Sequence, residues 1–417
     1  RRPPRSTPLY SSAASDVYKR QTIIYEAAFQ FNGVLAALDI LVFDNGQWKA
    51  YEVKSSTSVT ETYHLDATIQ WYAITGSGID LKDISIVYIH NQYEKDGEID
   101  VHQLFAFESV KEEVLELLPG IPNHVSALKN VLIQKEVPTK DIGPHCNDPY
   151  TCDFAGHCWK HIPDYSIFNI ARLTEPKKFE FYKKNIINFV DIPNDAELNE
   201  NQWMQVKCEL NNETFIDKEN IKGFLNALQY PLYFMDFETF STAIPVFDKS
   251  RPYQQLVFQY SLHIIPKKGG EVEHKEFLAE TDGIDPRLKF AEQLIADCGT
   301  DGDILVYNIG FERGKLNSLA ETFPHLSIYI GAIVSRLKDL MMPFQKRWYY
   351  TPSMQGSYSI KKVLPALVPD LSYKNLAINE GGTASNTFAA MLMGDFEGDV
   401  VQTRMDLLEY CKMDTYA

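Results

Sequence analysis

The sequence lacks an excess of positive charge, a long hydrophobic run and a dense set of cysteines. Its 417 residues include 40 Lys and Arg against 56 Asp and Glu, a formal net charge of −16. This balance argues against tight, nonspecific coating of DNA, since nucleic-acid binders usually carry a basic footprint. It does not exclude a nuclease, because bound metal ions offset clustered acids and a basic groove can exist on an acidic protein.

No stretch of about 18 apolar residues occurs, so a membrane span is not expected. The six cysteines and the absence of a secretory segment predict a reducing, cytoplasmic location. An apolar content of 45% is sufficient for the cores of two or three domains in a chain of this length.

Three acidic clusters stand out in the C-terminal half. Asp236 and Glu238 end an apolar run, and strand alternation would put both carboxylates on one face. Glu312 begins a helical pattern after another apolar strand, and Tyr410 and Asp414 lie one helical turn apart. Carboxylates suit Mg²⁺ or Mn²⁺, and two such ions about 3.5–4 Å apart can stabilise both the attacking and the leaving oxygen of a phosphodiester. Singly, each acid is more often a solvated strand end or a helix cap.

In this set of acids, residues 228–417 resemble the DnaQ-like 3′ to 5′ exonucleases, the DEDD group of the ribonuclease-H-like superfamily. The resemblance implies a set of metal ligands made of Asp236, Glu238, Glu312 and Asp414. It also implies that Tyr410 orients the attacking water. The chain departs from the family at Glu312, where Asp is usual, so the longer side chain would have to reach the metal from a shifted backbone. The alternative is an acid on the helix surface.

A second set of polar residues lies on a predicted hairpin in the N-terminal half. Two apolar runs flank Asp44-Asn45-Gly46, a strong signal for a tight turn. Asp39 then lies on the first strand, and Glu52 and Lys54 share one face of the second. An Asp and a Glu can hold a metal ion while the Lys amine steadies a water molecule or developing negative charge. The alternative is an exposed Glu/Lys pair on a solvated strand.

The surroundings of this hairpin add further candidates. Glu26 lies in a helical pattern before it, and Gln70 lies in another after it. Three cysteines recur downstream at equal spacing: Cys146, Cys152 and Cys158. In a chain without a secretory segment such a cluster indicates metal or Fe–S ligation rather than disulfides. Residues 22–165 thereby resemble the RecB-type branch of the PD-(D/E)XK nucleases, in which an iron–sulfur cluster clamps the domain.

This second resemblance implies a catalytic centre of Asp39, Glu52 and Lys54, supported by Glu26 and Gln70. It departs at Ile74, because the family commonly has Tyr four residues after the Gln. A 4Fe–4S cluster needs four protein ligands, and this segment supplies three. In the resembled family the fourth cysteine comes from far upstream.

Residues 1–21 are rich in Arg, Ser and Pro. We expect them to be a non-native or disordered segment fused to an interrupted reading frame, with a transit peptide as the alternative. The fourth cluster ligand would then be missing, and the chain would bind its cluster poorly. Zinc is the second choice for the cysteines, because three histidines lie beside them, at His145, His157 and His161.

A basic and aromatic stretch is a candidate nucleic-acid groove. Its members are Lys346, Arg347, Trp348, Lys361 and Lys362. Lys and Arg could contact phosphates while Trp348 stacks on a base. The alternative is a solvated loop with a packed Trp.

These patterns predict an α/β protein with two nuclease-like domains. A PD-(D/E)XK restriction-endonuclease-like domain would span residues 22–165, a helical linker 166–220, and a ribonuclease-H-like domain with a mixed central sheet 221–417. Strands of the last domain are expected at 232–236, 257–265 and 304–308, with a polar strand near 271–277. Its helices are expected near 285–297, 311–322, 383–393 and 400–416.

The expected function is that of a bacterial hydrolase of an uncharacterised family that joins the two modules. It would use Mg²⁺ or Mn²⁺, carry a 4Fe–4S cluster, and act on DNA or RNA, with preference for single strands or 3′ ends. The second module would release nucleotides from a 3′ end. The alternative is an inactive fold that serves as a nucleic-acid-binding or redox-responsive Fe–S regulatory module.

Overall fold

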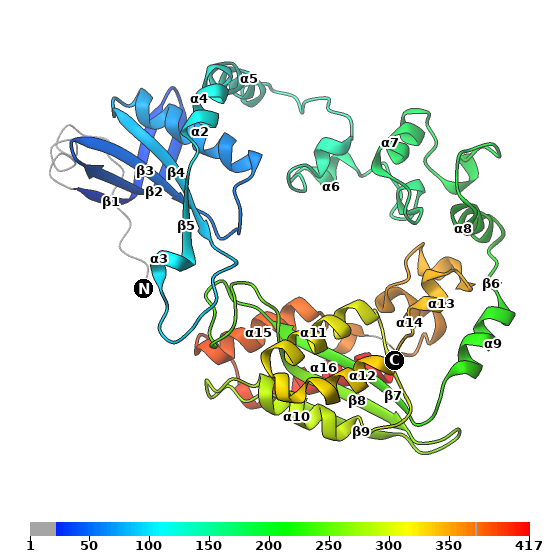
Figure 1. The fold of residues 1–417 in the computed structure, drawn as a ribbon. Coiled ribbons are helices and arrows are strands. Elements are labelled where there is room, and N and C mark those ends of the chain that lie inside the picture. The colour runs from blue at the N-terminus through cyan, green and yellow to red at the C-terminus, as the bar shows by residue number, and fades with distance from the viewer. Residues whose placement is uncertain (1–21, 372) are drawn as a thin grey trace. The chain divides into compact units, whose positions relative to one another are not determined.

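The computed structural model describes residues 22–371 and 373–417 (Figure 1). The segment expected to be non-native or disordered, residues 1–21, lies outside the described residues. The chain divides into two compact units, one reaching to Asp141 and including Thr242–Gln254, the other formed by Ile142–Ser241 and Gln255–Ala417. This division differs from the domain boundaries expected from the sequence, because the cysteine segment and the helical linker group with the second unit.

The first unit is built on a five-stranded sheet in the order β1-β2-β3-β4-β5. Its strands are β1 (Ile23–Phe31), β2 (Val34–Asp44), β3 (Gln47–Val53), β4 (Leu81–Ile89) and β5 (Phe105–Ser109). Neighbours are antiparallel except for β3 and β4, which are parallel. Asn45 and Gly46 have φ values of 50° and 80°, the left-handed pair that a type I′ turn requires. The predicted hairpin is therefore confirmed.

Helix α2 (Glu61–Gly76) makes the crossover between the parallel strands β3 and β4, as a parallel connection requires. It covers the sheet, and its Ala67, Trp71 and Ile74 join fully buried strand residues such as Leu38 and Ile84 in one core. The shorter helices of this unit are α3 (Val101–Leu104), α4 (Lys111–Leu117), η1 (Leu118–Gly120) and α5 (Ile121–Leu132).

The N-terminal part of the second unit consists of short helices with small cores of their own. These are η2 (Pro144–Cys146), α6 (Ala155–Cys158), η3 (Ile167–Asn169), α7 (Glu175–Lys183), η4 (Phe189–Asp191), α8 (Glu200–Asn211) and α9 (Lys218–Ala227). Between α8 and α9, strand β6 (Phe215–Ile216) pairs with β12 (Tyr349–Tyr350). This pairing explains why the linker groups with the second unit.

The second unit contains a mixed five-stranded sheet in the order β11-β10-β7-β8-β9. The strands are β7 (Leu232–Phe240), β8 (Leu256–Ile265), β9 (Glu273–Leu278), β10 (Asp303–Val306) and β11 (Leu337–Asp339). β7 is parallel to β10, β10 is parallel to β11, and β8 is antiparallel to both of its neighbours. The four predicted strands are present. β11 was not predicted, since three residues with a single buried side chain carry almost no periodic signal.

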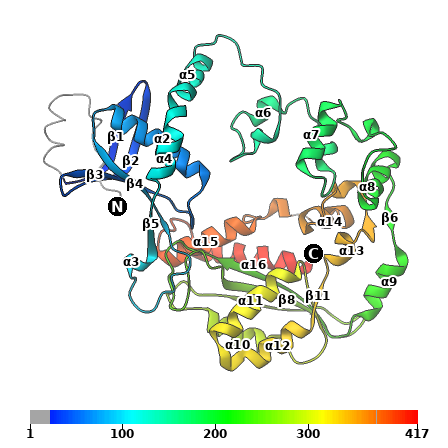
Figure 2. The ribbon, with the colours of Figure 1, turned by 45° about the horizontal axis from the view of Figure 1, so that its top comes forward.

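Helices cover both faces of this sheet (Figure 2). Consecutive residues of β8 show this directly, because Gln259 donates to the Leu407 carbonyl of α16 (Val400–Tyr416) whereas Tyr260 donates to Asp297 of α10 (Arg287–Asp297). The remaining helices are α11 (Ile309–Thr322), η5 (Pro324–Leu326), α12 (Ser327–Ser335), α13 (Met342–Gln345), η6 (Pro352–Met354), α14 (Ile360–Leu367), η7 (Tyr373–Asn375) and α15 (Gly381–Met393). Helices α10, α11, α15 and α16 match the four helices predicted for this region.

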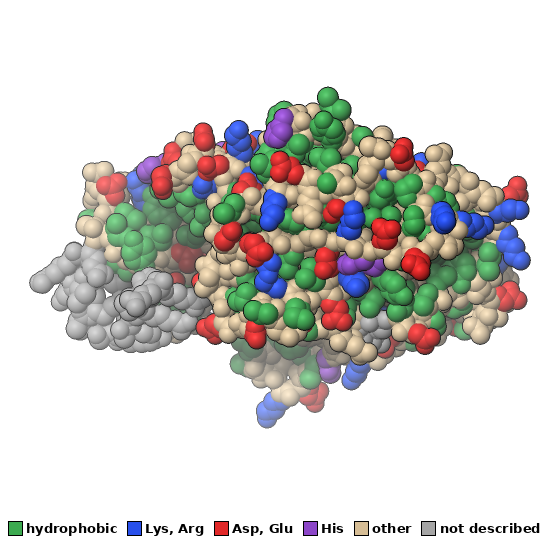
Figure 3. Space-filling view, turned by 90° about the horizontal axis from the view of Figure 1, so that it is seen from below, with side chains coloured by type: hydrophobic (Ala, Val, Ile, Leu, Met, Phe, Trp, Pro, Cys, Tyr) green, Lys and Arg blue, Asp and Glu red, His purple; other side chains and the backbone are tan. Residues whose placement is uncertain are grey.

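Two properties of the whole described chain bear on function. Among its described helices, none has the length and apolar character needed to cross a membrane. On the face drawn in Figure 3, acidic and basic side chains are interspersed with apolar ones. Nucleic acid bound on this face would therefore rely on local groups rather than on a broad basic field.

Candidate functional site

The acids of β7 lie on the central strand of the second sheet. Asp236 and Glu238 are two residues apart, so they project from the same face of the strand. Helix α16 packs against β7 and brings Asp414 to this face. One carboxylate oxygen from each of the three residues lies within 4.8 Å of the others. In the part of the chain that the structure describes, this is the one group of three His, Cys, Asp or Glu side chains so close together.

Burial and mutual repulsion disfavour the charged forms of these carboxylates. Burial, with the charges of Asp414, Glu238 and Glu312 added, raises the pKa of Asp236 well above its usual range. Burial and the charge of Asp414 raise the pKa of Glu238 to about 8. Burial also raises the pKa of Asp414 to about 6, against the lowering effects of a hydrogen bond from Tyr373 and of Lys361. Such a site favours a bound cation, which would relieve the repulsion.

Glu312 lies in the first turn of α11, immediately after β10. Its side chain is 1% exposed, so the alternative of a helix-surface acid is wrong. Burial, with Asp339 contributing, raises the pKa of Glu312 to about 8, and Oε2 has no hydrogen-bond partner among the described residues. Glu312 raises the pKa of Asp236, so it adjoins the three acids, although it is not part of the group within 4.8 Å.

Tyr410 is buried one helical turn before Asp414 on α16. A Cβ atom added to Gly381, the first residue of α15, would lie 3.8 Å from the Tyr410 hydroxyl and 3.7 Å from Oε2 of Glu238. Both groups therefore border one small open space that a side chain at position 381 would fill.

Tyr373 was not foreseen from the sequence. Its hydroxyl donates to Oδ1 of Asp414 at 2.6 Å, and its side chain is buried. It lies on η7, about forty residues before its partner. A single Tyr in a short turn carries no periodic signal, so only the fold could have identified it.

The predicted groove residues separate into two groups. Lys361 is exposed on α14 and lowers the pKa values of Glu238 and Asp414, which places its charge beside the acids. Lys362 donates to Oε1 of Gln355 at 2.6 Å. Lys346 is exposed and Trp348 is half-buried.

Arg347 does not fit the groove prediction. It is 5% exposed, and its Nη2 donates to the Gly356 carbonyl at 2.6 Å. The guanidinium also lies over the ring of Tyr350, 5.0 Å from its centroid. Because this cation is enclosed by its own loop, the prediction that it contacts a phosphate is wrong. Arg347 instead holds the loop together.

The polar residues of the first unit meet beside β3. Glu52 is 8% exposed, and Lys54, which directly follows β3, donates to its Oε1 at 2.9 Å. Asp39 on the neighbouring β2 accepts a hydrogen bond from the Val53 backbone at 2.7 Å. The alternative of a solvated Glu/Lys pair is wrong for Glu52, because that carboxylate is enclosed.

Helix α2 supplies two further side chains to this cluster. Gln70 is buried, and its supporting role in catalysis stays a prediction. Burial, with Asp39 contributing, raises the pKa of Glu52, and hydrogen bonds from Lys54 and Gln70 oppose the rise. Asp66, which sequence reasoning missed, accepts from Nζ of Lys54 at 2.5 Å. It precedes Gln70 by four residues, so a search for polar residues on one helix face would have found it.

Lys54 is thus held between two carboxylates. Burial lowers its pKa, but hydrogen bonds to Asp66 and Glu52 outweigh burial and raise it. An ammonium with a raised pKa keeps its positive charge over the physiological pH range.

Glu26 is a correction to the predicted secondary structure. It lies on strand β1 rather than on a helix, is exposed, and has a φ of 52°. Its neighbours Tyr25 and Ala27 pair with Ile40 and Leu38 of β2. Pairing of β1 with β2 makes this segment a strand, and the positive φ of Glu26 interrupts the two-residue alternation so that Ala27 and Phe29, like Ile24, are buried.

The three cysteines of the linker differ in exposure. Cys146 is buried, Cys152 is exposed and Cys158 is half-buried. Cys146 and Cys158 pack in one apolar cluster with Phe179. Within the described residues, no three Cys, His or acidic ligand atoms meet here closely enough to surround one ion, so the alternative of a zinc site is not assembled. An Fe–S cluster is larger than a single ion, and it stays a prediction.

Residues 233–359 match a family described as "Domain of unknown function (DUF2779)". Three bacterial proteins also align with the chain, each named as uncharacterised. One from Mycoplasma pneumoniae is 30% identical over 47% of this chain and 32% of its own length. One from Ureaplasma parvum is 31% identical over 41% of this chain and 27% of its own length. One from Mycoplasma genitalium is 27% identical over 56% of this chain and 37% of its own length.

The chain spans about a third of the length of these relatives. No solved structure matches it. The DUF2779 match contains Asp236, Glu238 and Glu312, whereas Tyr410 and Asp414 lie beyond its C-terminal limit. The fold therefore joins acids from inside and outside the matched segment.

Proposed function

We propose that the chain is a metal-dependent nuclease that hydrolyses phosphodiester bonds, with a 3′ to 5′ exonuclease centre at the acids of the second unit. The observation that carries this proposal is the gathering of Asp236, Glu238 and Asp414, with ligand oxygens all within 4.8 Å of one another. Buried like charges of this kind oppose folding unless cations neutralise them. Such an arrangement is typical of a functional site.

The residues present fit divalent cations. All of the ligand atoms are carboxylate oxygens, which Mg²⁺ and Mn²⁺ prefer. Oε2 of Glu312 is buried without a hydrogen-bond partner among the described residues, and Gly381 places no side chain in the position that would contact Glu238 and Tyr410. Asp236, Glu238, Glu312 and Asp414 would hold the ions. When bound, two cations stabilise the charge on the attacking and leaving oxygens of a phosphodiester.

The protein's own groups supply orientation and charge. The Tyr410 hydroxyl borders the same space as Glu238 and can hold a water molecule in line for attack. Tyr373 fixes the rotamer of Asp414 through the hydrogen bond of 2.6 Å. Lys361, exposed beside these acids, can contact a phosphate of the bound strand.

Strand order supports assigning the two units to the resembled folds. Numbered by its own strands, the sheet of the second unit runs 3-2-1-4-5, with strand 2 antiparallel to the rest. This is the arrangement expected of a ribonuclease-H-like sheet. The first unit has three antiparallel strands, a crossover helix and a parallel fourth strand, as expected of a PD-(D/E)XK core.

We further infer a second nuclease centre at Asp39, Glu52 and Lys54. The buried Glu52 and the charged Lys54 at 2.9 Å are the pair such a centre needs. The described residues gather fewer carboxylates here than in the second unit, so this centre supports fewer metal ligands. Lys54 can stabilise negative charge that develops on a phosphate oxygen.

The test is time-resolved degradation of 5′-labelled single-stranded DNA and RNA by the full chain, with Mn²⁺ or EDTA. We expect a metal-dependent ladder that shortens from the 3′ end and disappears in Asp236→Asn. Asp395→Asn, an exposed acid between α15 and α16, is the matched control and should retain activity. Retained strand binding with no cleavage of either substrate would reject the exonuclease in favour of a binding module.

A further inference from the structure

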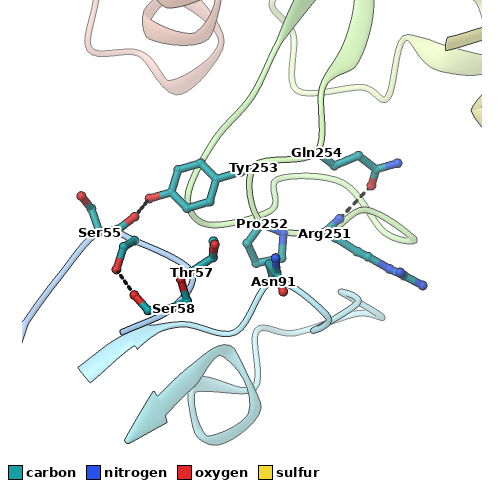
Figure 4. A pocket seen from close by; sticks show the side chains of 9 residues that line it. Ser55, Thr57, Ser58, Asn91, Arg251, Pro252, Tyr253 and Gln254 are labelled. Atoms are coloured by element: carbon teal, nitrogen blue, oxygen red, sulfur yellow. Dashed lines mark hydrogen bonds between the residues drawn. The ribbon is translucent and has the colours of Figure 1, made fainter. Parts of the chain in front are cut away.

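An open surface pocket of about 600 Å³ lies in the first unit, and part of its lining directly follows Lys54 in the sequence. We call it the hydroxyl pocket. It is lined by Ser55, Ser56, Thr57, Ser58, Asn91, Arg251, Pro252, Tyr253 and Gln254 (Figure 4). Four of these described lining residues carry hydroxyls on consecutive positions, two carry amides, one carries a guanidinium, and none is acidic. That composition contrasts with the net charge of −16 of the chain.

One wall of the pocket continues directly from the proposed centre. Lys54 is followed by the hydroxyl run 55–58 without an intervening residue. The backbone of this run stays attached to β4, because Lys54 N donates to the Val87 carbonyl at 2.8 Å and Ile89 N donates to that of Ser56 at 2.9 Å. The Ser56 hydroxyl donates to the Ser58 carbonyl at 3.0 Å. A group bound to the run would therefore lie on the chain segment that directly follows Lys54.

The segment Thr242–Gln254 forms the opposite wall. It is held by an ion pair of 2.5 Å between Lys95 and Asp248, and by the pair of 3.1 Å between Arg251 and Glu94. The Tyr253 hydroxyl donates to the Ser55 carbonyl, which ties the two walls together (Figure 4).

Local hydrogen bonds shape this wall. The backbone of Tyr253 has a φ of 59°, in the left-handed region, and donates to the Thr242 carbonyl at 2.8 Å. The side-chain oxygen of Gln254 accepts from the Arg251 backbone at 2.9 Å. These bonds hold Arg251 at the rim of the pocket.

We propose that the hydroxyl pocket binds a phosphate of the nucleic-acid strand that the first-unit centre acts on, an inference that rests on the proposed function. Ser, Thr and Asn side chains and guanidinium groups are the usual protein contacts to phosphate oxygens. A phosphate bound there would anchor the strand on the segment that directly follows Lys54.

Arg251 is the group that would discriminate phosphate from neutral ligands. The Arg251 side chain is 48% exposed, and the side chain of its partner Glu94 is 49% exposed. An ion pair this exposed contributes little stability, so a phosphate, which accepts two parallel hydrogen bonds from a guanidinium, can replace the carboxylate.

The experiment uses the full chain carrying Asp236→Asn and a fluorescein-labelled 12-nucleotide single strand of thymidylate. Binding is measured by fluorescence anisotropy in EDTA between 50 and 200 mM salt. We expect Arg251→Gln to raise Kd roughly tenfold and to lower the log–log salt slope by about 0.7, the value for one phosphate contact on a single strand. Thr57→Val, which removes one hydroxyl at constant shape, should weaken binding less. Inorganic phosphate should compete weakly, because it offers one group of the strand.

Glu94→Gln is the matched control for a structural role. It breaks the same ion pair but leaves the cation, so Kd should stay unchanged or fall. Equal weakening by Arg251→Gln and Glu94→Gln, or an unchanged salt slope in Arg251→Gln, would overturn the proposal and leave Arg251 as a clamp of the segment.

Cleavage by the same Asp236→Asn protein with Mn²⁺ separates this proposal from the proposed function. Residual cleavage that Glu52→Gln abolishes, with a raised KM and an unchanged kcat in Arg251→Gln, supports both. The same cleavage with an unaltered KM in Arg251→Gln rejects the pocket and keeps the nuclease. Absence of residual cleavage, with binding weakened as expected by Arg251→Gln, rejects the first-unit nuclease and keeps the phosphate site.

Discussion

Replacing Glu238 by Gln should stabilise the metal-free second unit at neutral pH while removing its metal-dependent activity. The carboxylate is buried, and burial together with Asp414 raises its pKa from an ordinary value of 4.5 to about 8. The folded chain therefore holds the proton more tightly than the unfolded chain does. Stability is greatest below pH 4.5 and falls as the pH rises toward 8, because the folded state has to keep this carboxyl protonated while the unfolded chain releases the proton.

The size of the effect follows from that difference in pKa. Each tenfold difference in proton affinity is worth about 1.4 kcal/mol. The loss of folding stability caused by the raised pKa of Glu238 is then roughly 5 kcal/mol above pH 8, about 3 kcal/mol at pH 7 and about 1 kcal/mol at pH 5. Gln has nearly the same shape and no charge, so Glu238→Gln should recover most of this loss. In a domain of 150–250 residues, about 3 kcal/mol corresponds to a rise in Tm of roughly 6–12 °C.

The assay is calorimetric melting of the full chain in EDTA at pH 5 and pH 7. Glu321→Gln, an exposed acid on α11, is the matched control and should leave Tm unchanged. Mn²⁺ should raise the Tm of the unmodified protein more than that of Glu238→Gln, because the variant has lost a ligand. A lower Tm for Glu238→Gln at both pH values would refute the reasoning, since it would mean that the carboxylate stabilises the fold.

Two further predictions concern other parts of the chain. In an Asp236→Asn background, Asp66→Asn should lower first-unit cleavage roughly tenfold. It should also move the basic limb of the pH profile of cleavage to lower pH, because the raised pKa of Lys54 falls without this partner. Replacement of the exposed Asp80 by Asn is the control, and an unmoved pH profile in Asp66→Asn would exclude the positioning role. Gly302→Ala should lower Tm far more than Gly283→Ala. Both glycines have positive φ, +84° and +81°, but a Cβ at 302 would lie 2.0 Å from the Pro231 carbonyl oxygen whereas position 283 is open. We expect the free energy of unfolding to fall by more than about 2 kcal/mol in Gly302→Ala and by about 1 kcal/mol in Gly283→Ala. Equal losses in the two variants would contradict the steric overlap at position 302.

Local patterns were sufficient for much of the fold. The Asn45-Gly46 turn was predicted because two consecutive left-handed residues have few sequence solutions. The main strands and helices of the second unit follow from hydrophobic periodicity, which depends only on near neighbours. The same periodicity put Asp236 and Glu238 on one strand face, and the structure bears this geometry out.

Local patterns failed where a partner distant in sequence decides the outcome. Glu26 was assigned to a helix, but pairing of its strand with β2 made it part of the sheet. Arg347 was predicted to be a surface cation, but the structure shows it enclosed by the loop around Gly356. Tyr373 and Asp66 became part of their sites only through contacts with Asp414 and Lys54.

By itself the sequence determined which acids exist, in what order, and that Asp236 and Glu238 share one strand face while Tyr410 and Asp414 lie one helical turn apart. These properties depend on spacing along the chain, and spacing is visible in the sequence. The tertiary structure alone decided that Asp414 meets Asp236 and Glu238, that Glu312 is buried beside them, and that Thr242–Gln254 belongs to the first unit. Those outcomes depend on how sheets and helices pack over separations of tens to hundreds of residues, where burial and pairing outweigh local preference.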